Sequence, residues 1–148
     1  MTDDRTLRLL VHGRSPGNWN MAVDELLLEQ AARDGIVTLR FYQWDAATLS
    51  LGYFQAYRER MNHPASHSAP AVRRVTGGGA LVHQRELTYA LALPAEHPLA
   101  RDHRRLYEIV HDWLLSMLAD FGVAARICGC DACGDDCETS RESAFLCF

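Results

Sequence analysis

The stretch from Val72 to Leu93 reads VRRVTGGGALVHQRELTYALAL, and the rest of the chain is interpreted as a scaffold around it. Residues 72–75 and 80–82 have the composition of β-strands, and the glycines between them form a turn. A third strand, residues 87–93, follows the polar turn at residues 83–86. The pattern therefore predicts a three-stranded meander whose first turn is rich in glycine.

Three consecutive glycines, Gly77, Gly78 and Gly79, are more than a hairpin requires. One residue without a Cβ is enough to supply the positive φ of a tight turn. Three in a row leave backbone N–H groups uncovered, so that a ligand can lie directly on the main chain. Spacing alone leaves a plain flexible turn as the alternative.

Arg73 and Arg74 enter this loop from the preceding strand. Successive side chains of a strand point to opposite faces, so at most one of the two arginines faces a ligand. We expect Arg74 to face inward, where a carboxylate or phosphate would bind it through two parallel, charge-assisted hydrogen bonds. The alternative is that both side chains are solvated.

The run from Arg73 to Ala80, followed by His83 and by Glu86-Leu87-Thr88-Tyr89, resembles the signature of the lipoate-protein ligase and octanoyltransferase family. This family is related to the biotin protein ligases. The resemblance implies their class II synthetase-like catalytic fold across the whole chain. It also implies that the acyl chain or an adenylate is bound by Arg73, Arg74, Gly77, Gly78, Gly79, Ala80, Leu81, Val82 and His83.

The composition of the chain limits its function classes. A chain of 148 residues suits one domain with a core of its own, so residues 1–148 are predicted to form a single, partial catalytic domain. A net charge of −4 gives no electrostatic reason to expect binding to nucleic acid or to a membrane. The sequence shows no signal peptide and has an odd number of cysteines, five, so a cytoplasmic location is predicted.

Upstream of Val72, residues 7–11 are predicted to form a strand and residues 12–17 a loop. Asn18 or Asn20 can cap the helix that follows, and Gly35 is expected to end it. The carboxylates of Asp24-Glu25 are interpreted as partners of the helix dipole.

Residues 38–44 alternate in the manner of a strand, with Leu39 and Phe41 predicted to point inward and Tyr42 left open. Another strand, residues 48–51, ends at Gly52. The aromatic residues after it, Tyr53, Phe54 and Tyr57, either wall an acyl tunnel or belong to the core.

Downstream, residues 104–121 carry apolar side chains at intervals of three and four, and Gly122 is the expected stop of this helix. Residues 123–127 are predicted to add a strand. About six strands with two helices predict an α+β fold, a mixed and mainly antiparallel sheet with helices packed on it.

Four cysteines, Cys128, Cys130, Cys133 and Cys137, stand within ten residues near the end of the chain. Four thiolates can meet the tetrahedral demand of zinc, although this spacing is unusual for a zinc site. Unpaired loop thiols and an iron–sulfur cluster are the alternatives. The family resemblance does not predict this cluster.

Cys147 stands in the apolar run Ala144 to Phe148, where composition favours a buried and inert thiol. The resemblance implies a different role, that of the catalytic cysteine of one octanoyltransferase branch. Its thiolate would take octanoyl from acyl carrier protein as a thioester and pass it to a lysine of a lipoyl domain, in a 2-oxoacid dehydrogenase or the glycine cleavage H protein.

The chain departs from that family in one respect, because its basic residues are all arginine. The family carries a functional lysine shortly after the cysteine, and this chain ends at Phe148. The domain is therefore expected to be incomplete at its C-terminus, with the remainder missing, lost or encoded as a separate segment. Three functions remain open. A transferase would need no cofactor. An ATP- and Mg-dependent ligase is the second possibility, because Gly79 is typical of these ligases. A non-catalytic fragment with a structural metal is the third.

Overall fold

The computed structural model describes residues 7–127, which group into two compact units, 7–94 and 95–127. In chain order the elements are β1 (Leu7–Ser15), α1 (Gly17–Asp34), β2 (Val37–Trp44), β3 (Thr48–Leu51), η1 (Tyr57–Asn62), η2 (Pro64–Ser66), β4 (Ala71–Arg73), β5 (Leu81–His83), β6 (Thr88–Ala92), η3 (Pro98–Ala100) and α2 (His103–Asp120), where η marks a 3-10 helix. The predicted α+β class is confirmed. That residues 1–148 form a single domain stays a prediction.

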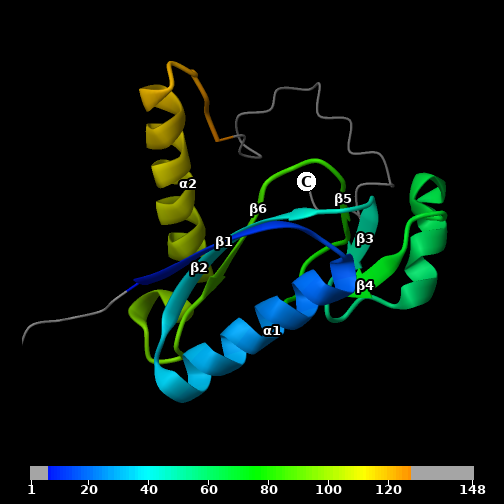
Figure 1. Cartoon of the computed structure of the whole chain (residues 1–148), viewed down its shortest axis with the longest axis horizontal. Helices are drawn as coiled ribbons and strands as arrows, with labels where there is room; N and C mark the ends of the chain where they lie inside the picture. Colours follow the sequence, from blue (N-terminus) through cyan, green and yellow to red (C-terminus); the bar gives the residue numbers. More distant parts are fainter. Residues whose placement is uncertain (1–6, 128–148) are drawn as a thin grey trace, which may run out of the picture. The chain divides into compact units, whose positions relative to one another are not determined.

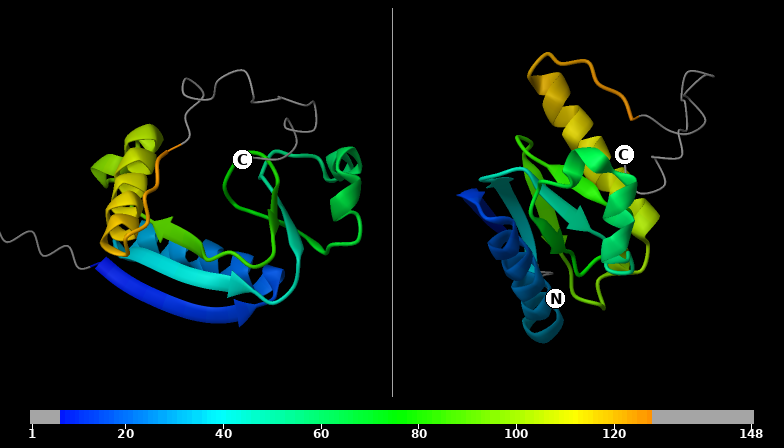
Figure 2. Two further views of the ribbon diagram at one scale, coloured as in Figure 1. Left: turned by 90° about the horizontal axis from the view of Figure 1, so that it is seen from above. Right: turned by 90° about the vertical axis from the view of Figure 1, so that its right-hand side faces the viewer.

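The strands of the first unit form two three-stranded sheets (Figure 1). In one, β2 lies between β1 and β6, pairing parallel with β1 and antiparallel with β6. In the other, β3 lies between β4 and β5, again with one parallel and one antiparallel partner. Figure 2 shows α1 lying along one face of the β1-β2-β6 sheet.

The predicted meander is wrong, because β4 and β5 do not pair with each other. Both pair with β3, and β6 pairs with β2. All four residues of β3 are buried, and a strand buried on both faces accepts a neighbour along each edge. The glycine-rich loop therefore carries the chain from one edge of β3 to the other, across about 10 Å, which is two strand spacings. A tight hairpin turn is too short for that crossing.

α1 begins earlier than predicted, at Gly17, with Pro16 as its N-cap and no side-chain capping bond. Its first turn lies against β3, because a Cβ on Gly17 would come within 2.7 Å of the Thr48 side chain. Asn20 is not a cap, because it lies fully buried inside the helix and its amide donates to the Gln43 carbonyl oxygen at 3.1 Å. The predicted end at Gly35 is confirmed, with a left-handed φ of 71°.

β2 buries the opposite face from the one predicted. Leu39 and Phe41 are half-buried, whereas the buried side chains are Thr38, Arg40, Tyr42 and Trp44. The period of two was predicted correctly, but polar residues occupy the face under α1. This arrangement is stable because the buried Arg40 is paired and hydrogen-bonded there.

In the second unit, α2 begins one residue after Asp102, whose carboxylate accepts a hydrogen bond from the Arg105 amide at 2.9 Å. The helix ends at Asp120, and Gly122 follows with a φ of 73°, as expected for a helix stop. The strand predicted at residues 123–127 is wrong, because these residues have no regular secondary structure.

Candidate functional site

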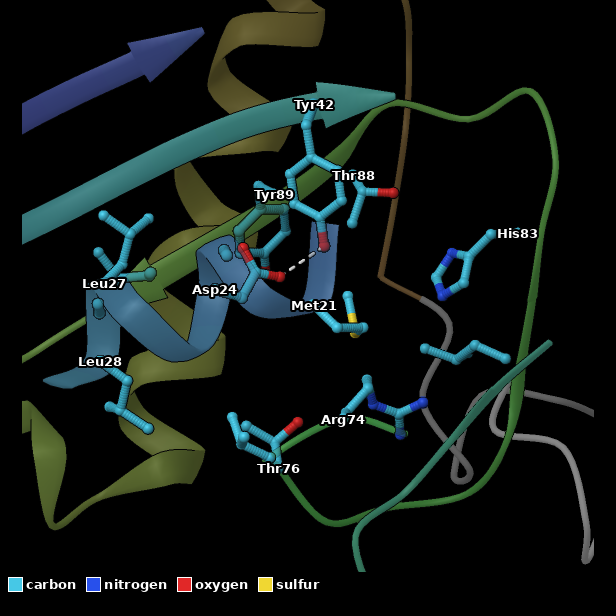
Figure 3. Close-up of a pocket in the computed structure, with 15 residues that line it drawn as sticks. Met21, Asp24, Leu27, Leu28, Tyr42, Arg74, Thr76, His83, Thr88 and Tyr89 are labelled. Carbon is cyan, nitrogen blue, oxygen red and sulfur yellow. Dashed lines mark hydrogen bonds between the residues drawn. The ribbon is translucent and has the colours of Figure 1, made fainter. Parts of the chain in front are cut away.

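A pocket of about 350 Å³ opens in the first unit, between α1, β6, β5 and the start of the glycine-rich loop (Figure 3). This volume lies at the small end of the range of about 300–1,000 Å³ found for ligand pockets. Its lining residues are Met21, Asp24, Leu27, Leu28, Tyr42, Arg74, Val75, Thr76, Leu81, His83, Thr88, Tyr89, Ala90, Leu91 and Ala92.

The two ends of this pocket differ in polarity. In Figure 3, Leu27 and Leu28 of α1 lie at one end, and Arg74 and His83 lie at the other. Met21 reaches between them from the same helix. Such an arrangement fits an amphiphilic ligand with a short apolar chain and a polar head, because each part then meets a matching surface.

Arg74 binds the protein itself through both of its terminal nitrogens. Nη1 donates to the backbone oxygen of Ser50 at 2.9 Å and to its Oγ at 2.8 Å. Nη2 donates to the carbonyl oxygens of Gly77 at 3.1 Å and Gly79 at 2.7 Å. Arg74 therefore holds the glycine-rich loop against β3 and still presents its charge to the pocket.

Arg73 points to the other face, as the strand alternation predicts. Its Nη1 donates to three backbone oxygens, those of Gly52, Tyr53 and Gln55. The Tyr53 amide in turn donates to the Thr76 oxygen at 2.9 Å. Arg74 thus holds the glycine-rich loop, whereas Arg73 holds the segment that follows β3 and does not line the pocket.

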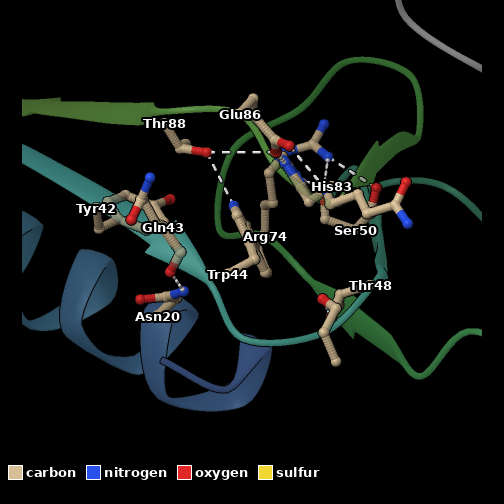
Figure 4. Close-up of polar contacts among 12 residues, drawn as sticks. Asn20, Tyr42, Gln43, Trp44, Thr48, Ser50, Arg74, His83, Glu86 and Thr88 are labelled. Carbon is tan, nitrogen blue, oxygen red and sulfur yellow. Dashed lines mark hydrogen bonds and ion pairs between the residues drawn. The ribbon is translucent and has the colours of Figure 1, made fainter. Parts of the chain in front are cut away.

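His83 is the centre of a hydrogen-bonded row beside the pocket (Figure 4). Its Nε2 lies 2.8 Å from the Ser50 Oγ, and its Nδ1 lies 2.6 Å from the Glu86 Oε1. The Trp44 ring stacks on the imidazole with centroids 4.0 Å apart, and its indole N–H donates to Thr88. These contacts leave the imidazole a single orientation.

Burial is the main cause that lowers the pKa of His83, and the nearby charge of Arg74 lowers it further. The Glu86 carboxylate opposes this shift but does not reverse it. For Glu86, burial pushes the pKa up, but hydrogen bonds from the Gln84 amide and from His83 outweigh burial and hold that pKa below its ordinary value. At neutral pH the pair is therefore a neutral imidazole beside a carboxylate.

A buried arginine beneath α1 pairs with Asp24, a carboxylate that lines the pocket. The side chain of Arg40 is fully buried, and its Nη1 donates to the Asp24 Oδ1 at 2.6 Å. The Tyr42 hydroxyl donates to the other carboxylate oxygen at 2.8 Å. Burial and then Asp24 raise the pKa of Tyr42, which keeps this donor protonated. The interpretation of Asp24 as a dipole partner is wrong, because it lies beyond the first turn and binds β2.

Of the predicted ligand-binding residues, Arg74, Leu81 and His83 line the pocket. The others do not line it, and they are Arg73, Gly77, Gly78, Gly79, Ala80 and Val82. Gly77 and Gly78 are exposed and Ala80 is fully buried, packed with Leu49 and Leu51. That these residues contact a ligand stays a prediction.

Several residues at the pocket were not predicted from the sequence. Met21, Asp24 and Leu28 are separated by three and four positions, the spacing of one helix face, and that spacing was the available signal. Ser50 carries a hydroxyl in a fully buried strand, which indicates that the hydroxyl has a partner. Thr76 and Thr88 stand within the motif that resembles the family, but the sequence did not single them out as pocket residues.

Tyr53, Phe54 and Tyr57 neither wall this pocket nor belong to the core. Their exposed fractions are 56%, 88% and 59%. Both alternatives proposed for them are therefore wrong. They follow β3 along the chain, and none of the three lines the pocket, although the Tyr53 amide donates to the oxygen of Thr76, which does.

The predicted metal ligands Cys128, Cys130, Cys133 and Cys137 and the predicted nucleophile Cys147 lie outside the described residues. Within residues 7–127, no cluster of His, Cys, Asp or Glu side chains is suited to hold a metal ion. The same part of the chain contains no helix with the length and apolarity that a membrane crossing requires.

Comparison with known proteins identifies the family of this chain. The family model for the lipoyl protein ligase A/B catalytic domain matches residues 16–139. This chain belongs to that family. The octanoyltransferase LipM of Halalkalibacterium halodurans is 36% identical over 125 residues, which cover 81% of this chain and 45% of that protein. LipM of Carboxydothermus hydrogenoformans is 38% identical over 126 residues, covering 82% and 47%. The chain thus spans about half the length of these relatives.

Solved structures of this family share the fold. A putative lipoate protein ligase of Thermoplasma acidophilum with bound lipoic acid superposes with a TM-score of 0.65 at 25% identity, over 84% of this chain and 52% of that one. A bi-partite lipoate protein ligase from the same organism, described with its E2 lipoyl domain, gives a TM-score of 0.61 at 25% identity, over 82% and 48%.

Proposed function

We propose that this chain is the acyl-binding part of an octanoyltransferase that acts in protein lipoylation. The observation that carries the proposal is the pocket, with Leu27 and Leu28 at its apolar end and Arg74 and His83 at its polar end. Octanoyl has the same division, an aliphatic chain and one polar acyl group. The similarity to octanoyltransferases supports octanoyl over other amphiphiles of this size.

The proposed reaction has two steps. The thiolate of Cys147 attacks the thioester carbonyl of octanoyl acyl carrier protein, and the carrier thiol leaves. The ε-amine of a lysine in a lipoyl domain then attacks the enzyme thioester, so that an amide forms and the thiolate is released. Neither step requires a nucleotide or a redox partner. The acyl group would lie along α1, with its carbonyl near Arg74 and His83.

The alternative is an ATP-dependent lipoate ligase, which the lipoic acid bound to the archaeal relative supports. In it, Arg74 and the backbone of residues 79–82 would hold the adenylate phosphate. The described residues fit a magnesium ion poorly, because Asp24, the carboxylate in the pocket lining, already accepts bonds from Arg40 and Tyr42. The transferase is therefore the preferred proposal.

The deciding experiment is peptide-resolved mass spectrometry after incubation with octanoyl acyl carrier protein. The transferase predicts an octanoyl adduct on the peptide that carries Cys147 and its loss in Cys147→Ser. A Cys137→Ser variant is the matched control and keeps the adduct. ATP–pyrophosphate exchange with lipoate, in the absence of an adduct, would favour the ligase. Zinc in the purified protein with neither activity would favour the non-catalytic fragment.

Calorimetry with octanoate separates binding from chemistry. Each buried methylene contributes about 0.8 kcal/mol, so hexanoate should bind roughly fifteenfold more weakly than octanoate. Equal affinity for the two acids would show that the chain does not enter the apolar end, and the proposal would fail even if an adduct formed elsewhere.

A further inference from the structure

A continuous row of polar contacts connects Glu86 to the glycine-rich loop (Figure 4). It runs from the Glu86 carboxylate to His83, from His83 to the hydroxyl of Ser50, and from Ser50 to Arg74. Nη2 of Arg74 then reaches the carbonyl oxygens of Gly77 and Gly79. Ser50 is fully buried at the middle of this row, where each polar atom needs a partner.

The direction of every hydrogen bond in the row follows from its ends. An ionised Glu86 only accepts, so the Nδ1 of His83 must carry a proton. With His83 neutral, its Nε2 has a lone pair and no proton, and the Ser50 hydroxyl must donate to it. The Ser50 oxygen can then accept from Nη1 of Arg74. The donors and acceptors of all four side chains match.

Protonation of His83 would break this match. A protonated Nε2 donates to the Ser50 oxygen, to which Arg74 already donates. The serine hydroxyl would lose its acceptor in a place closed to water, and two cations would face the same oxygen. The charged groups facing His83 are Glu86 on its own turn and Arg74 at the end of β4. Asp24, paired with Arg40, lines the same pocket from α1.

We propose that Ser50 and His83 are positioning residues, which hold Arg74 and through it the glycine-rich loop, and that protonation of His83 releases this loop. The last step, that a held loop favours binding of the acyl group, rests on the proposed function. The row of polar contacts and its effect on the loop do not depend on the proposed function, and both can be measured without a ligand.

Two backbone amides report on the attachment of the loop. The Arg74 amide donates to the Leu51 oxygen and the Tyr53 amide to the Thr76 oxygen, each at 2.9 Å. In Ser50→Ala, amide exchange measured by NMR should become about tenfold faster at both, relative to the Asp45 amide, which lies outside the loop. Ser66→Ala is the matched control, because Ser66 is equally buried but bonds to the His63 oxygen.

The tautomer of His83 gives an independent readout. With ¹⁵N-labelled histidine, the ligand-free protein should show a neutral ring protonated at Nδ1, and the signal should be assigned by its loss in His83→Gln. Below the pH at which that signal titrates, the protection of the Arg74 and Tyr53 amides should fall. In His83→Gln the side-chain oxygen can still accept from Ser50, so protection should be retained and no longer depend on pH.

A neutral His83 ring protonated at Nε2 would overturn this proposal, and so would equal amide exchange rates in Ser50→Ala and Ser66→Ala. Neither result would count against the acyl pocket. If Ser50→Ala does not fold, the His83 tautomer and the pH dependence of amide protection in the wild-type protein still decide between the outcomes. Octanoate affinity should fall about tenfold in Ser50→Ala and stay unchanged in Ser66→Ala. Absence of octanoate binding in a protein with protected amides would instead refute the proposed function.

Discussion

Gly52 lies directly beneath the carbonyl group of Gly78, so closely that a Cβ on Gly52 would come within 2.0 Å of the Gly78 oxygen. The loop can cross the end of β3 only because this position has no side chain. Gly78 itself has a φ of 90°, which L side chains rarely adopt. The crossing therefore depends on glycine at both positions.

Gly52→Ala should displace the loop and destabilise the protein by about 1–3 kcal/mol or more, the usual cost of overpacking, and should weaken octanoate binding. Gly13→Ala is the control, because a Cβ on Gly13 would meet no other part of the protein within 4 Å and its φ is ordinary. Urea unfolding and calorimetry would measure the two effects. Unchanged stability in Gly52→Ala would show that the loop does not cross as described.

Asp24→Asn should cost about 3–5 kcal/mol of unfolding free energy, because the fully buried Arg40 would keep its charge without a counter-ion. Asp34→Asn removes a carboxylate from an exposed pair with Arg33 and should cost far less, because water screens the charges of both partners. Urea denaturation of the two variants makes the comparison. Similar small losses of unfolding free energy in both variants would mean that the other partners of Arg40 are sufficient to stabilise its buried charge.

Stability should decrease as the pH falls below the ordinary histidine range. The pKa of His83 is lowered in the folded state, so the unfolded chain takes up the proton first and binds more protons. The contribution of neutral His83 to the free energy of unfolding is complete above the pKa of histidine in the unfolded chain, about 6.5. This contribution is lost as the pH falls from there toward the lowered pKa of the folded state. His83→Gln should reduce this slope in unfolding curves measured from pH 7.5 to 5, and an unchanged slope would assign it to other groups.

Trp44→Ala and Phe54→Ala should differ sharply in stability. Trp44 is 2% exposed and stacks on His83, so its truncation should cost about 3–5 kcal/mol. Phe54 is 88% exposed, so its truncation should change stability by no more than about 0.5 kcal/mol. Thermal unfolding would measure both. A large loss in Phe54→Ala would restore the core interpretation of that residue.

Leu28→Trp should shorten the apolar end of the pocket and remove the preference for octanoate. The expected advantage over hexanoate, roughly fifteenfold, should fall toward one. Leu26→Trp is the matched control, because Leu26 is exposed to a similar degree as Leu28 on the same helix but does not line the pocket. Calorimetry with both acids would show whether the ratio changes only in Leu28→Trp.

The sequence alone determined the local features of this protein. Glycines predicted where both helices end, because a left-handed backbone after a helix needs a residue without a Cβ. The alternation of a strand predicted that Arg73 and Arg74 would point apart. The run around the three glycines predicted the family, and the pattern of strands and helices predicted the α+β class.

Tertiary structure decided what these features contact. β4 and β5 pair with β3 and not with each other. This pairing depends on the burial of β3 and on the contact between Gly52 and Gly78, which are distant from each other in sequence. The buried face of β2 was set by the pairing of Arg40 with Asp24, which no periodicity encodes. Ser50 became part of the site only because folding brought it between His83 and Arg74. Local rules constrain the backbone of each segment, whereas partners that neutralise buried polar groups come from remote parts of the chain.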